Sequence, residues 1–255
     1  MTVYKKDEGE TGPGRSFIRL RHAVPFLMRR AVDRKKGERV RGDSIVIEPH
    51  HRKAAEGILP VVLRTLREGD GRIGVTIAGE SGSGKSETAA ALAEALAGAG
   101  VGSLILQQDD YFVYPPKTND RTRRADIGWV GPQEVRLDLM DEHMRAFIDG
   151  ATIVEKPLVD YEDDNISTEV VTTGDARVVI AEGTYTTLLA AARHRAFINR
   201  DYTQTRKHRE KRNRDASELD VFIDKVLAIE HAIISSHMAR ADIVVNDDYS
   251  VTPVA

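Results

Sequence analysis

Cysteine is absent from this chain of 255 residues. Without thiols, disulfide bonds, thiolate catalysis and cysteine-ligated zinc are excluded, and the composition is compatible with a reducing cytoplasm. No apolar run is long enough to span a bilayer, and the start of the chain, Met1 to Asp7, lacks the apolar core of a signal peptide. We therefore expect a soluble, cytoplasmic protein with no membrane partner.

A strong excess of charge of either sign is also missing. The formal net charge is −3 with 30% charged residues, so nonspecific binding to nucleic acid is not expected. A basic amphipathic stretch, residues 17–41, is typical of a surface helix packed on a domain. A contact with nucleic acid or with an oligomer partner is the alternative for this stretch, so a homodimer stays open.

Residues 79–86 read Gly-Glu-Ser-Gly-Ser-Gly-Lys-Ser and match the phosphate-binding loop pattern G-x-x-x-x-G-K-[ST]. An apolar run, 73–78, predicts a strand before the loop, and an Ala- and Leu-rich run, 87–97, predicts a helix after it. A Gly/Ser-rich linker needs no such flanks, whereas a loop at a helix N-terminus can turn its N–H groups toward phosphates. Lys85 is expected to reach the β- and γ-phosphates, and Ser86 to ligate Mg²⁺. The expected nucleotide contacts are Gly79, Ser81, Gly82, Ser83, Gly84, Lys85, Ser86 and Glu87.

The pattern after the loop alternates strand and helix, which predicts an α/β fold with a mainly parallel sheet and helices on both faces. The expected strands are 101–106, 151–154, 178–181 and 242–245, and the expected helices are 132–148, 186–193, 201–212 and 219–239. Residues 1–71 are expected to form an N-terminal extension before the main domain, 72–255. The extension is predicted to have a disordered start, a helix within 17–41, a short strand at 44–47 and a helix at 52–67.

Carboxylates follow two of the expected strands. Asp109 and Asp110 come after the strand 101–106, and Glu182 ends the strand 178–181. Ligands of an open parallel sheet lie off the carboxyl ends of its strands, so these groups should face the bound phosphates. One of the paired aspartates could accept a proton from a substrate hydroxyl, although an Asx turn or helix cap is an equal alternative. Glu182 is expected to hold the Mg²⁺ water shell or the substrate.

Two further segments suggest parts that close over a ligand. Residues 205–215 are densely basic and favour a lid whose guanidinium groups bind phosphate oxygens, with a solvated helix as the alternative. Trp129 lies between Gly128 and Gly131 and could close over a substrate or serve as a packing anchor.

Taken in order, these motifs resemble the uridine kinase/phosphoribulokinase group of P-loop kinases, including the bacterial pantothenate kinases. Residues 108–112, Gln-Asp-Asp-Tyr-Phe, stand where that group has Gln-Asp-x-Phe-Tyr, and residues 157–161, Pro-Leu-Val-Asp-Tyr, are similar to its Pro-x-Tyr-Asp segment. Its Glu-Gly strand end, its arginine lid and its Ala-Asp-hydrophobic strand are matched at 182–183, 206–215 and 241–245. The resemblance covers roughly 72–251 and implies a P-loop NTPase fold with the lid near 204–216.

The resemblance implies an ATP- and Mg²⁺-dependent kinase that transfers the γ-phosphoryl group to a hydroxyl of a small metabolite. By that match Asp109 is the catalytic base, acting with Lys85 and the lid residues Arg209 and Arg214, while Arg206 and Arg212 bind the nucleotide. Ser86, Glu182 and Asp109 are the implied metal-site residues. The implied acceptor-site residues are Asp110, Tyr111, Asp126, Trp129, Asp160, Tyr161 and Glu182. Which of Asp109 and Asp110 is the base stays open.

Departures from the family pattern concern the acceptor. Phe112 and Val159 stand where uridine kinases carry tyrosine, and the acidic run 162–164 stands where they have cationic residues, so uridine and cytidine are expected to be poor acceptors. Two other functions stay open. One is a nucleotide-controlled binding module or switch, although the Asn-Lys-x-Asp motif of GTPases is absent. The other is a nucleoside monophosphate kinase, in which Arg121, Arg123 and Arg124 would bind the acceptor phosphate.

Overall fold

The computed structural model describes residues 39–40, 43–69, 71–203 and 221–253. They belong to one compact unit, Lys36–Ala255. The disordered start, most of the helix expected within 17–41 and the arginine lid lie outside the described residues. Of the helix expected at 201–212, only the first three residues are described, and residues 202–203 are helical.

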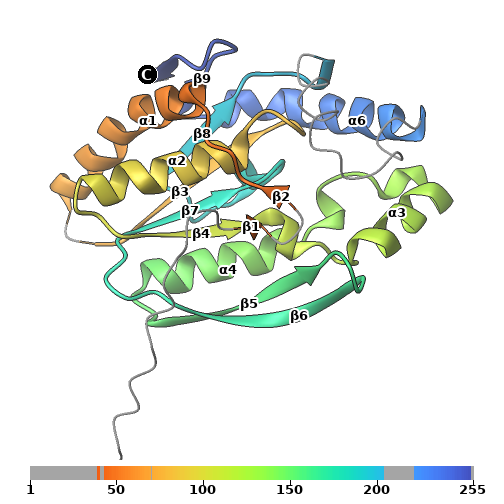
Figure 1. Cartoon of the computed structure of the whole chain (residues 1–255), viewed down its shortest axis with the longest axis horizontal. Coiled ribbons are helices and arrows are strands. Elements are labelled where there is room, and N and C mark those ends of the chain that lie inside the picture. Colours follow the sequence, from red (N-terminus) through yellow and green to blue (C-terminus); the bar gives the residue numbers. More distant parts are fainter. Residues whose placement is uncertain (1–38, 41–42, 70, 204–220, 254–255) are drawn as a thin grey trace, which may run out of the picture. The chain divides into compact units, whose positions relative to one another are not determined.

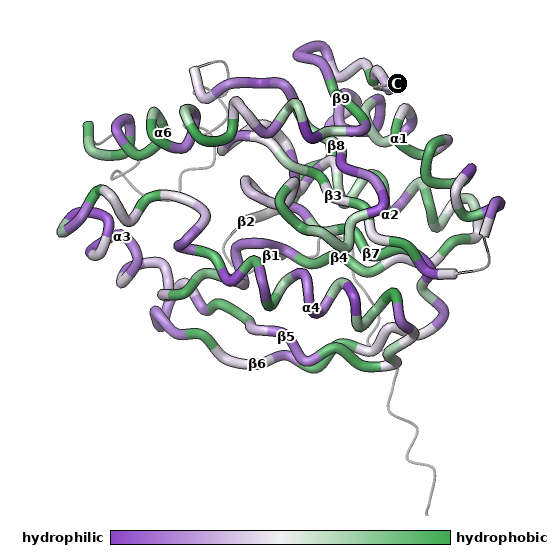
Figure 2. Tube along the Cα trace, turned by 180° about the vertical axis from the view of Figure 1, so that it is seen from behind, coloured by the Kyte–Doolittle hydropathy of each residue, from purple (hydrophilic) through white to green (hydrophobic). Residues whose placement is uncertain are grey.

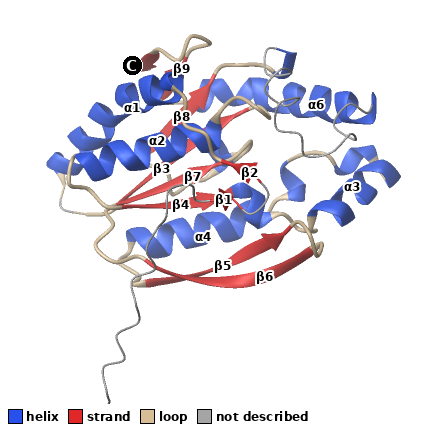
Figure 3. Cartoon of the chain, in the orientation of Figure 1, coloured by secondary structure: helices blue, strands red, loops and turns tan. Residues whose placement is uncertain are grey.

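The centre of the unit is a six-stranded sheet with the order β10-β9-β8-β3-β7-β4 (Figures 1 and 3). Neighbouring strands run parallel except for β10, which is antiparallel to β9. The strands are β3 Ile73–Gly79, β4 Ser103–Gln107, β7 Val178–Glu182, β8 His194–Ile198, β9 Ile243–Val245 and β10 Val251–Pro253. The predicted mainly parallel sheet is confirmed, and β3, which leads into the phosphate loop, lies near its middle.

Helices cover both faces of the sheet, as predicted. Side chains on one face of β3, Val75 and Ile77, pack with α1 and α2, while Val179 and Ala181 of β7 pack with Met144 and its neighbours on α4. Successive residues of a strand point to opposite faces, so apolar residues in sequence feed two cores. In Figure 2 the central strands are mostly hydrophobic, whereas α3 is hydrophilic. The helices are α1 Pro49–Glu68, α2 Lys85–Gly98, α3 Pro116–Ala125, α4 Leu137–Ile148 and α6 Val221–Ile234.

The helix α1 contributes to the main core although it precedes the expected domain boundary at residue 72. Its buried residues Ala54, Ile58 and Val62 belong to the same hydrophobic cluster as β3 and α2. The boundary itself stays a prediction, and the extension is not separate from the core at this helix.

The strand expected at 151–154 as part of the alternating sheet pattern is corrected by the structure. Strand β5, Ile153–Asp160, pairs antiparallel with β6, Asn165–Thr172, in a sheet of its own. On β5, Val154 and Lys156 are buried while Ile153 and Glu155 are exposed. One exposed face is usual for an antiparallel hairpin, whereas strands of the parallel sheet are buried on both sides.

Several other boundaries differ from the expectation. The helix expected at 186–193 is only a short 3₁₀ turn, Thr186–Leu188, and the following strand β8 was not predicted. The helix expected at 132–148 divides into a 3₁₀ turn, Pro132–Glu134, and α4. Residues 45–48 form no strand, so the strand expected at 44–47 is wrong; β1 Arg39–Val40 and β2 Asp43–Ser44 are two-residue pieces. The helix expected at 219–239 continues past α6 as a 3₁₀ helix, Ser235–Arg240.

None of the helices formed by the described residues is both long and apolar enough to cross a membrane.

Candidate active site

The phosphate loop leaves β3 at Gly79 and enters α2 at Lys85 through glycines with positive φ. Gly82 and Gly84 have φ values of 74° and 90°. A Cβ on Gly84 would lie 2.8 Å from Nε2 of His51, so only glycine fits this position. The hydroxyl of Ser83 is buried and has no hydrogen-bond partner among the described residues. An unpaired donor inside a glycine cradle fits a phosphate oxygen.

The outer side of the loop is held by a residue far away in the sequence. Tyr249, in the turn between β9 and β10, donates its hydroxyl to the backbone oxygen of Ser83 at 3.1 Å. Arg200 at the end of β8 donates to the same hydroxyl at 2.6 Å. Tyr249 has a positive φ of 60°, a conformation that costs free energy in a residue with a side chain. The turn is therefore held in an unfavourable backbone conformation where it contacts the loop.

The first residues of α2 meet the end of β7. The Nζ of Lys85 donates to the backbone oxygen of Glu80 at 2.9 Å, which places the ammonium group back over the loop. The hydroxyl of Ser86 donates to Oε1 of Glu182 at 3.0 Å. Ser86 and Glu182, predicted separately, are therefore direct neighbours.

Glu182 is buried at the end of β7, paired across to Ile77 of β3. Burial, with the nearby Asp109 carboxylate, raises the pKa of Glu182 to about 7, although Lys85 and the hydrogen bond from Ser86 act in the opposite direction. Two carboxylates and a hydroxyl are hard oxygen ligands of the kind that Mg²⁺ takes. In the described part of the chain no group of three or more His, Asp or Glu side chains converges as a metal site. Mg²⁺ fits such a sparse donor set because it keeps several waters and substrate phosphate ligands.

The two neighbouring aspartates occupy different environments. Both lie in the 3₁₀ turn Gln108–Tyr111 after β4. Asp110 is buried, paired through Oδ2 with Lys156 Nζ at 2.6 Å and through Oδ1 with the backbone N–H of Val159 at 3.1 Å. Asp109 is half-buried, accepts a long hydrogen bond of 3.4 Å from the hydroxyl of Tyr161, and lies near enough to Glu182 to raise its pKa. Asp110 is therefore held by the hairpin, and the assignment of Asp109 as the base stays a prediction.

Other expected acceptor residues are spread around this centre. Tyr111 is fully buried in the core, and its hydroxyl shares a hydrogen bond of 2.9 Å with His143. Asp160 accepts backbone N–H groups of the β5–β6 turn, and the exposed Asp126 accepts the N–H of Gly128. Trp129 donates from its indole to the side chain of Asn119 at 2.8 Å. These contacts stabilise turns and packing, whereas Tyr161 donates a hydrogen bond to Asp109.

A buried ionic cluster beside this centre was not predicted. Glu134 has no exposed surface and accepts hydrogen bonds from Asn119 Nδ2 at 2.8 Å, from Arg123 Nε at 2.7 Å and from the N–H of Gly131 at 2.9 Å. Arg123 also reaches Glu230 on α6, with Nη2 lying 3.3 Å from Oε1. Its members come from α3, a 3₁₀ turn and α6, and no local pattern in the sequence pairs such distant charges.

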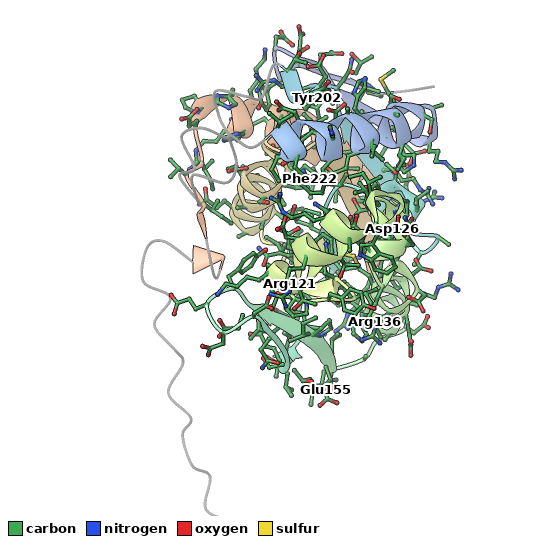
Figure 4. The ribbon with its side chains drawn as sticks, turned by 90° about the vertical axis from the view of Figure 1, so that its right-hand side faces the viewer. Arg121, Asp126, Arg136, Glu155, Tyr202 and Phe222 are labelled. Carbon is green, nitrogen blue, oxygen red and sulfur yellow. The ribbon has the colours of Figure 1, made fainter. Side chains whose placement is uncertain are left out.

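The lid arginines, Arg206, Arg209, Arg212 and Arg214, lie outside the described residues, so their role stays a prediction. The chain that enters this segment is fixed at the phosphate loop. Glu80, a loop residue, accepts the backbone N–H of Tyr202 at 2.7 Å and bonds Nδ1 of His231 on α6 at 2.6 Å. Tyr202 is labelled in Figure 4. Tyr202, among the last residues described before the basic segment, is therefore held at the phosphate loop.

Proteins similar to this chain include several kinases. The chain is 28% identical over 194 residues to the bifunctional alpha-galactosidase/sucrose kinase AgaSK of Mediterraneibacter gnavus, a match that covers 71% of this chain and spans only 21% of AgaSK. It is 29% identical over 188 residues to a uridine kinase of Ligilactobacillus salivarius, covering 68% of this chain and 83% of that protein. A solved structure described as a possible uridine kinase from Bacillus stearothermophilus has the same fold, with a TM-score of 0.56 and 18% identity over 76% of this chain and 97% of that chain.

Membership is decided by the span of the family match. The profile of the phosphoribulokinase / uridine kinase family covers residues 73–246, from the start of β3 to just past the end of β9. That span is well over half of the chain and contains the phosphate loop, Asp109 and Glu182. This chain belongs to the phosphoribulokinase / uridine kinase family of P-loop kinases, and it is a phosphotransferase.

Proposed function

We propose that this protein is an ATP- and Mg²⁺-dependent kinase that transfers the γ-phosphoryl group to a hydroxyl of a small metabolite without negative charge. The observation that supports the proposal is that Glu182 is hydrogen-bonded by Ser86 and lies close enough to Lys85 and Asp109 for both to shift its pKa. These residues come from the carboxyl ends of three adjacent parallel strands, β3, β7 and β4. This is the edge of an open parallel sheet at which ligands bind.

Each residue has a role that follows from its position. The N–H groups of the loop and Lys85 bind the β- and γ-phosphates, and Ser86 with Glu182 would hold Mg²⁺. Mg²⁺, when bound, neutralises charge on the phosphates. Asp109 accepts the proton of the acceptor hydroxyl while the oxygen of that hydroxyl bonds to the γ-phosphorus. The bond from that phosphorus to the β-phosphate oxygen then breaks and ADP leaves. The lid arginines would stabilise the charge that spreads over the transferred group.

The described charges disfavour an acceptor that carries a phosphate. Arg123 is paired with Glu134 and Glu230, Arg124 with Asp120 at 2.8 Å, and Arg121 lies 3.7 Å from Asp164. Of the three arginines that a nucleoside monophosphate kinase would use, Arg123 is therefore already held by two carboxylates, and the other two lie at the surface beside one carboxylate each. An anionic acceptor would also meet Asp109 and Glu182, which repel it.

The relatives include a sucrose kinase and a uridine kinase, so both a sugar and a nucleoside are represented among similar proteins. Phe112 and Val159 lack the hydroxyl groups that uridine kinases have at those places. A site that cannot pair the polar groups of a pyrimidine nucleoside loses discrimination for it. We therefore favour a sugar, polyol or amino alcohol over uridine.

The test is release of ADP from ATP with and without acceptors. We would compare sucrose, D-fructose, sorbitol, ethanolamine, uridine, CMP and D-glycerate at matched concentrations. Stimulation by at least one neutral acceptor, lost in Asp109→Asn, is the expected result. ATP binding with no acceptor-stimulated turnover across the panel would support a switch or binding module, and preference for CMP would support a monophosphate kinase.

A further inference from the structure

Helices α3 and α6 face each other beside the catalytic centre, and one charged pair joins them. Figure 4 shows α3, which carries Arg121, opposite α6, which carries Phe222. Arg123 Nη2 and Glu230 Oε1 lie 3.3 Å apart, and their side chains are only 17% and 13% exposed. Such burial is costly for charges unless they are paired, so both groups are held where they are by each other and by Glu134.

Each member of the pair keeps one polar end that is not used. Nε and Nη2 of Arg123 donate to the two carboxylates, and among the described residues Nη1 has no hydrogen bond. Oε1 of Glu230 accepts from Arg123, and Oε2 accepts no hydrogen bond from the part of the chain that the structure describes. A donor on Arg123 and an acceptor on Glu230 are therefore left on two side chains that hold each other in place through Nη2 and Oε1.

A third polar group in the same cluster also has no partner. The side chain of Tyr185 is buried, and its hydroxyl makes no hydrogen bond to any described residue. Burial raises the pKa of Tyr185, and the carboxylates of Glu230 and Glu134 raise it further, which places the phenol close to both. Buried polar groups are usually paired, so the cluster contains a buried hydroxyl, close to Glu230 and Glu134, whose hydrogen bond is not yet made.

The cluster lies within electrostatic reach of the phosphoryl-transfer residues. The pKa of Glu230 is raised mainly by burial, lowered by Arg123 and Lys85, and raised by Glu134 and Asp109. Lys85 is expected to contact the transferred phosphate, and Asp109 the reacting hydroxyl. A molecule that touches Glu230 can therefore place another of its groups at Asp109.

We propose that Arg123 and Glu230, with Tyr185, form the subsite that binds two neighbouring hydroxyl groups of a polyhydroxylated acceptor. One hydroxyl donates to Oε2 of Glu230, and its neighbour accepts from Nη1 of Arg123. A guanidinium beside a carboxylate matches the donor–acceptor order of a vicinal diol. A third hydroxyl, at Asp109, is the one phosphorylated. This inference rests on the proposed kinase function and narrows its acceptor to a sugar or polyol.

The test replaces Glu230 by glutamine, which keeps the shape and removes the charge. Asp224→Asn, an exposed change on the same helix, is the matched control. With the neutral acceptor that wild type phosphorylates best, Glu230→Gln should raise the KM for that acceptor by about 10- to 100-fold. The KM for ATP should change much less than the KM for the acceptor, because the proposed hydrogen bond is to the acceptor alone. The same ratio of KM values, variant to wild type, is then measured with mono-deoxy forms of the acceptor. For the form that lacks the hydroxyl bound by Glu230, the two KM values should agree within about threefold.

A binding measurement separates this inference from the kinase proposal. Calorimetry with sucrose, D-fructose and sorbitol, in the presence of a non-hydrolysable ATP analogue and Mg²⁺, reports acceptor binding without turnover. Binding that is lost in Glu230→Gln and kept in Asp224→Asn supports the subsite even if no acceptor is phosphorylated, in which case the kinase proposal fails alone. Equal penalties for every deoxy form, an unchanged acceptor KM, or no polyol binding by wild type would overturn the subsite. A lower melting temperature in Glu230→Gln with unchanged acceptor binding would show that the pair only joins the helices.

Discussion

Asp110 and Lys156 form a buried ion pair, with Oδ2 and Nζ 2.6 Å apart, that ties the turn after β4 to the hairpin strand β5. Among the described residues the neighbouring Asp109 has no ion-pair partner, and it lies close enough to Glu182 to raise the pKa of that carboxyl. Two adjacent carboxylates thus have different surroundings, because Asp110 is held in an ion pair and Asp109 is close to Glu182.

We expect Asp109→Asn to lower kcat by about 100-fold or more, with the KM for ATP nearly unchanged, because a positioned general base is lost. Asp110→Asn should instead lower the free energy of unfolding by roughly 3 kcal/mol, because Lys156 loses its buried partner and keeps only the more exposed Glu169. Steady-state kinetics and urea denaturation of both variants check this. A larger loss of kcat in a stably folded Asp110→Asn protein would reverse the assignment.

Lys85→Ala should abolish phosphoryl transfer and leave the fold intact. The Lys85 ammonium contacts a loop carbonyl and makes no contribution to the hydrophobic core, so its removal costs charge at the phosphates and little packing. Lys225→Ala, an exposed change on α6, is the control. ADP release and circular dichroism are the measurements, and turnover within a few-fold of wild type would contradict the central role of this lysine.

Nucleotide binding in the presence of Mg²⁺ should strengthen as the pH rises from 6 to 8. Burial and Asp109 raise the pKa of Glu182 to about 7 in the metal-free protein, so the carboxyl is largely protonated below that pH. A cation binds the ionised form, so affinity should rise by about tenfold per pH unit below pH 7 and level off above it. Calorimetric titration of ATP with Mg²⁺ checks this. Glu182→Gln removes the group and, if the assignment is right, also this part of the pH dependence.

Arg209→Ala and Arg214→Ala should each lower kcat substantially, because lid guanidinium groups act on charge that develops during transfer. Protease cleavage within residues 206–214 should slow when ATP and Mg²⁺ are added. Cleavage at the same rate with and without nucleotide would favour a solvated basic helix instead.

A chain that starts at residue 72 should not fold stably, whereas a chain that starts at residue 45 should. The first lacks α1, whose fully buried Ile58 and Val62 pack against α2 and the sheet, and the second keeps it. Loss of several buried aliphatic side chains exceeds the free energy that stabilises a typical domain. Expression followed by thermal unfolding of both chains checks the prediction. A folded, ATP-binding chain from residue 72 would restore the boundary expected from the sequence.

The parts of the fold and site that were predictable are those encoded within a few consecutive residues. Gly79 to Ser86 contains its own glycines, lysine and hydroxyl, and the apolar run before it can only be a buried strand once the loop is assigned. Strand β7 was found for the same reason, because its four apolar residues precede Glu182 directly.

The parts that were missed depend on pairing between distant segments. Strand β8 begins with His194 and Arg195, which hide its strand character, and it is defined by its register beside β3. The cluster of Arg123, Glu134 and Glu230 joins residues up to 107 positions apart. Each of these charges alone is indistinguishable from a solvated one, because sequence shows that a charge is present and not what it faces.

The hydrogen bond from Tyr249 to Ser83 has a consequence for the order in which the protein becomes functional. The two residues are 166 positions apart, so the loop leaves the ribosome well before the turn that braces it. Until that turn has formed, the glycine-rich loop lacks its contact with Tyr249, so the native loop needs the last strands of the sheet. Formation of the sheet's far edge is thus the step that completes the contacts around the phosphate loop.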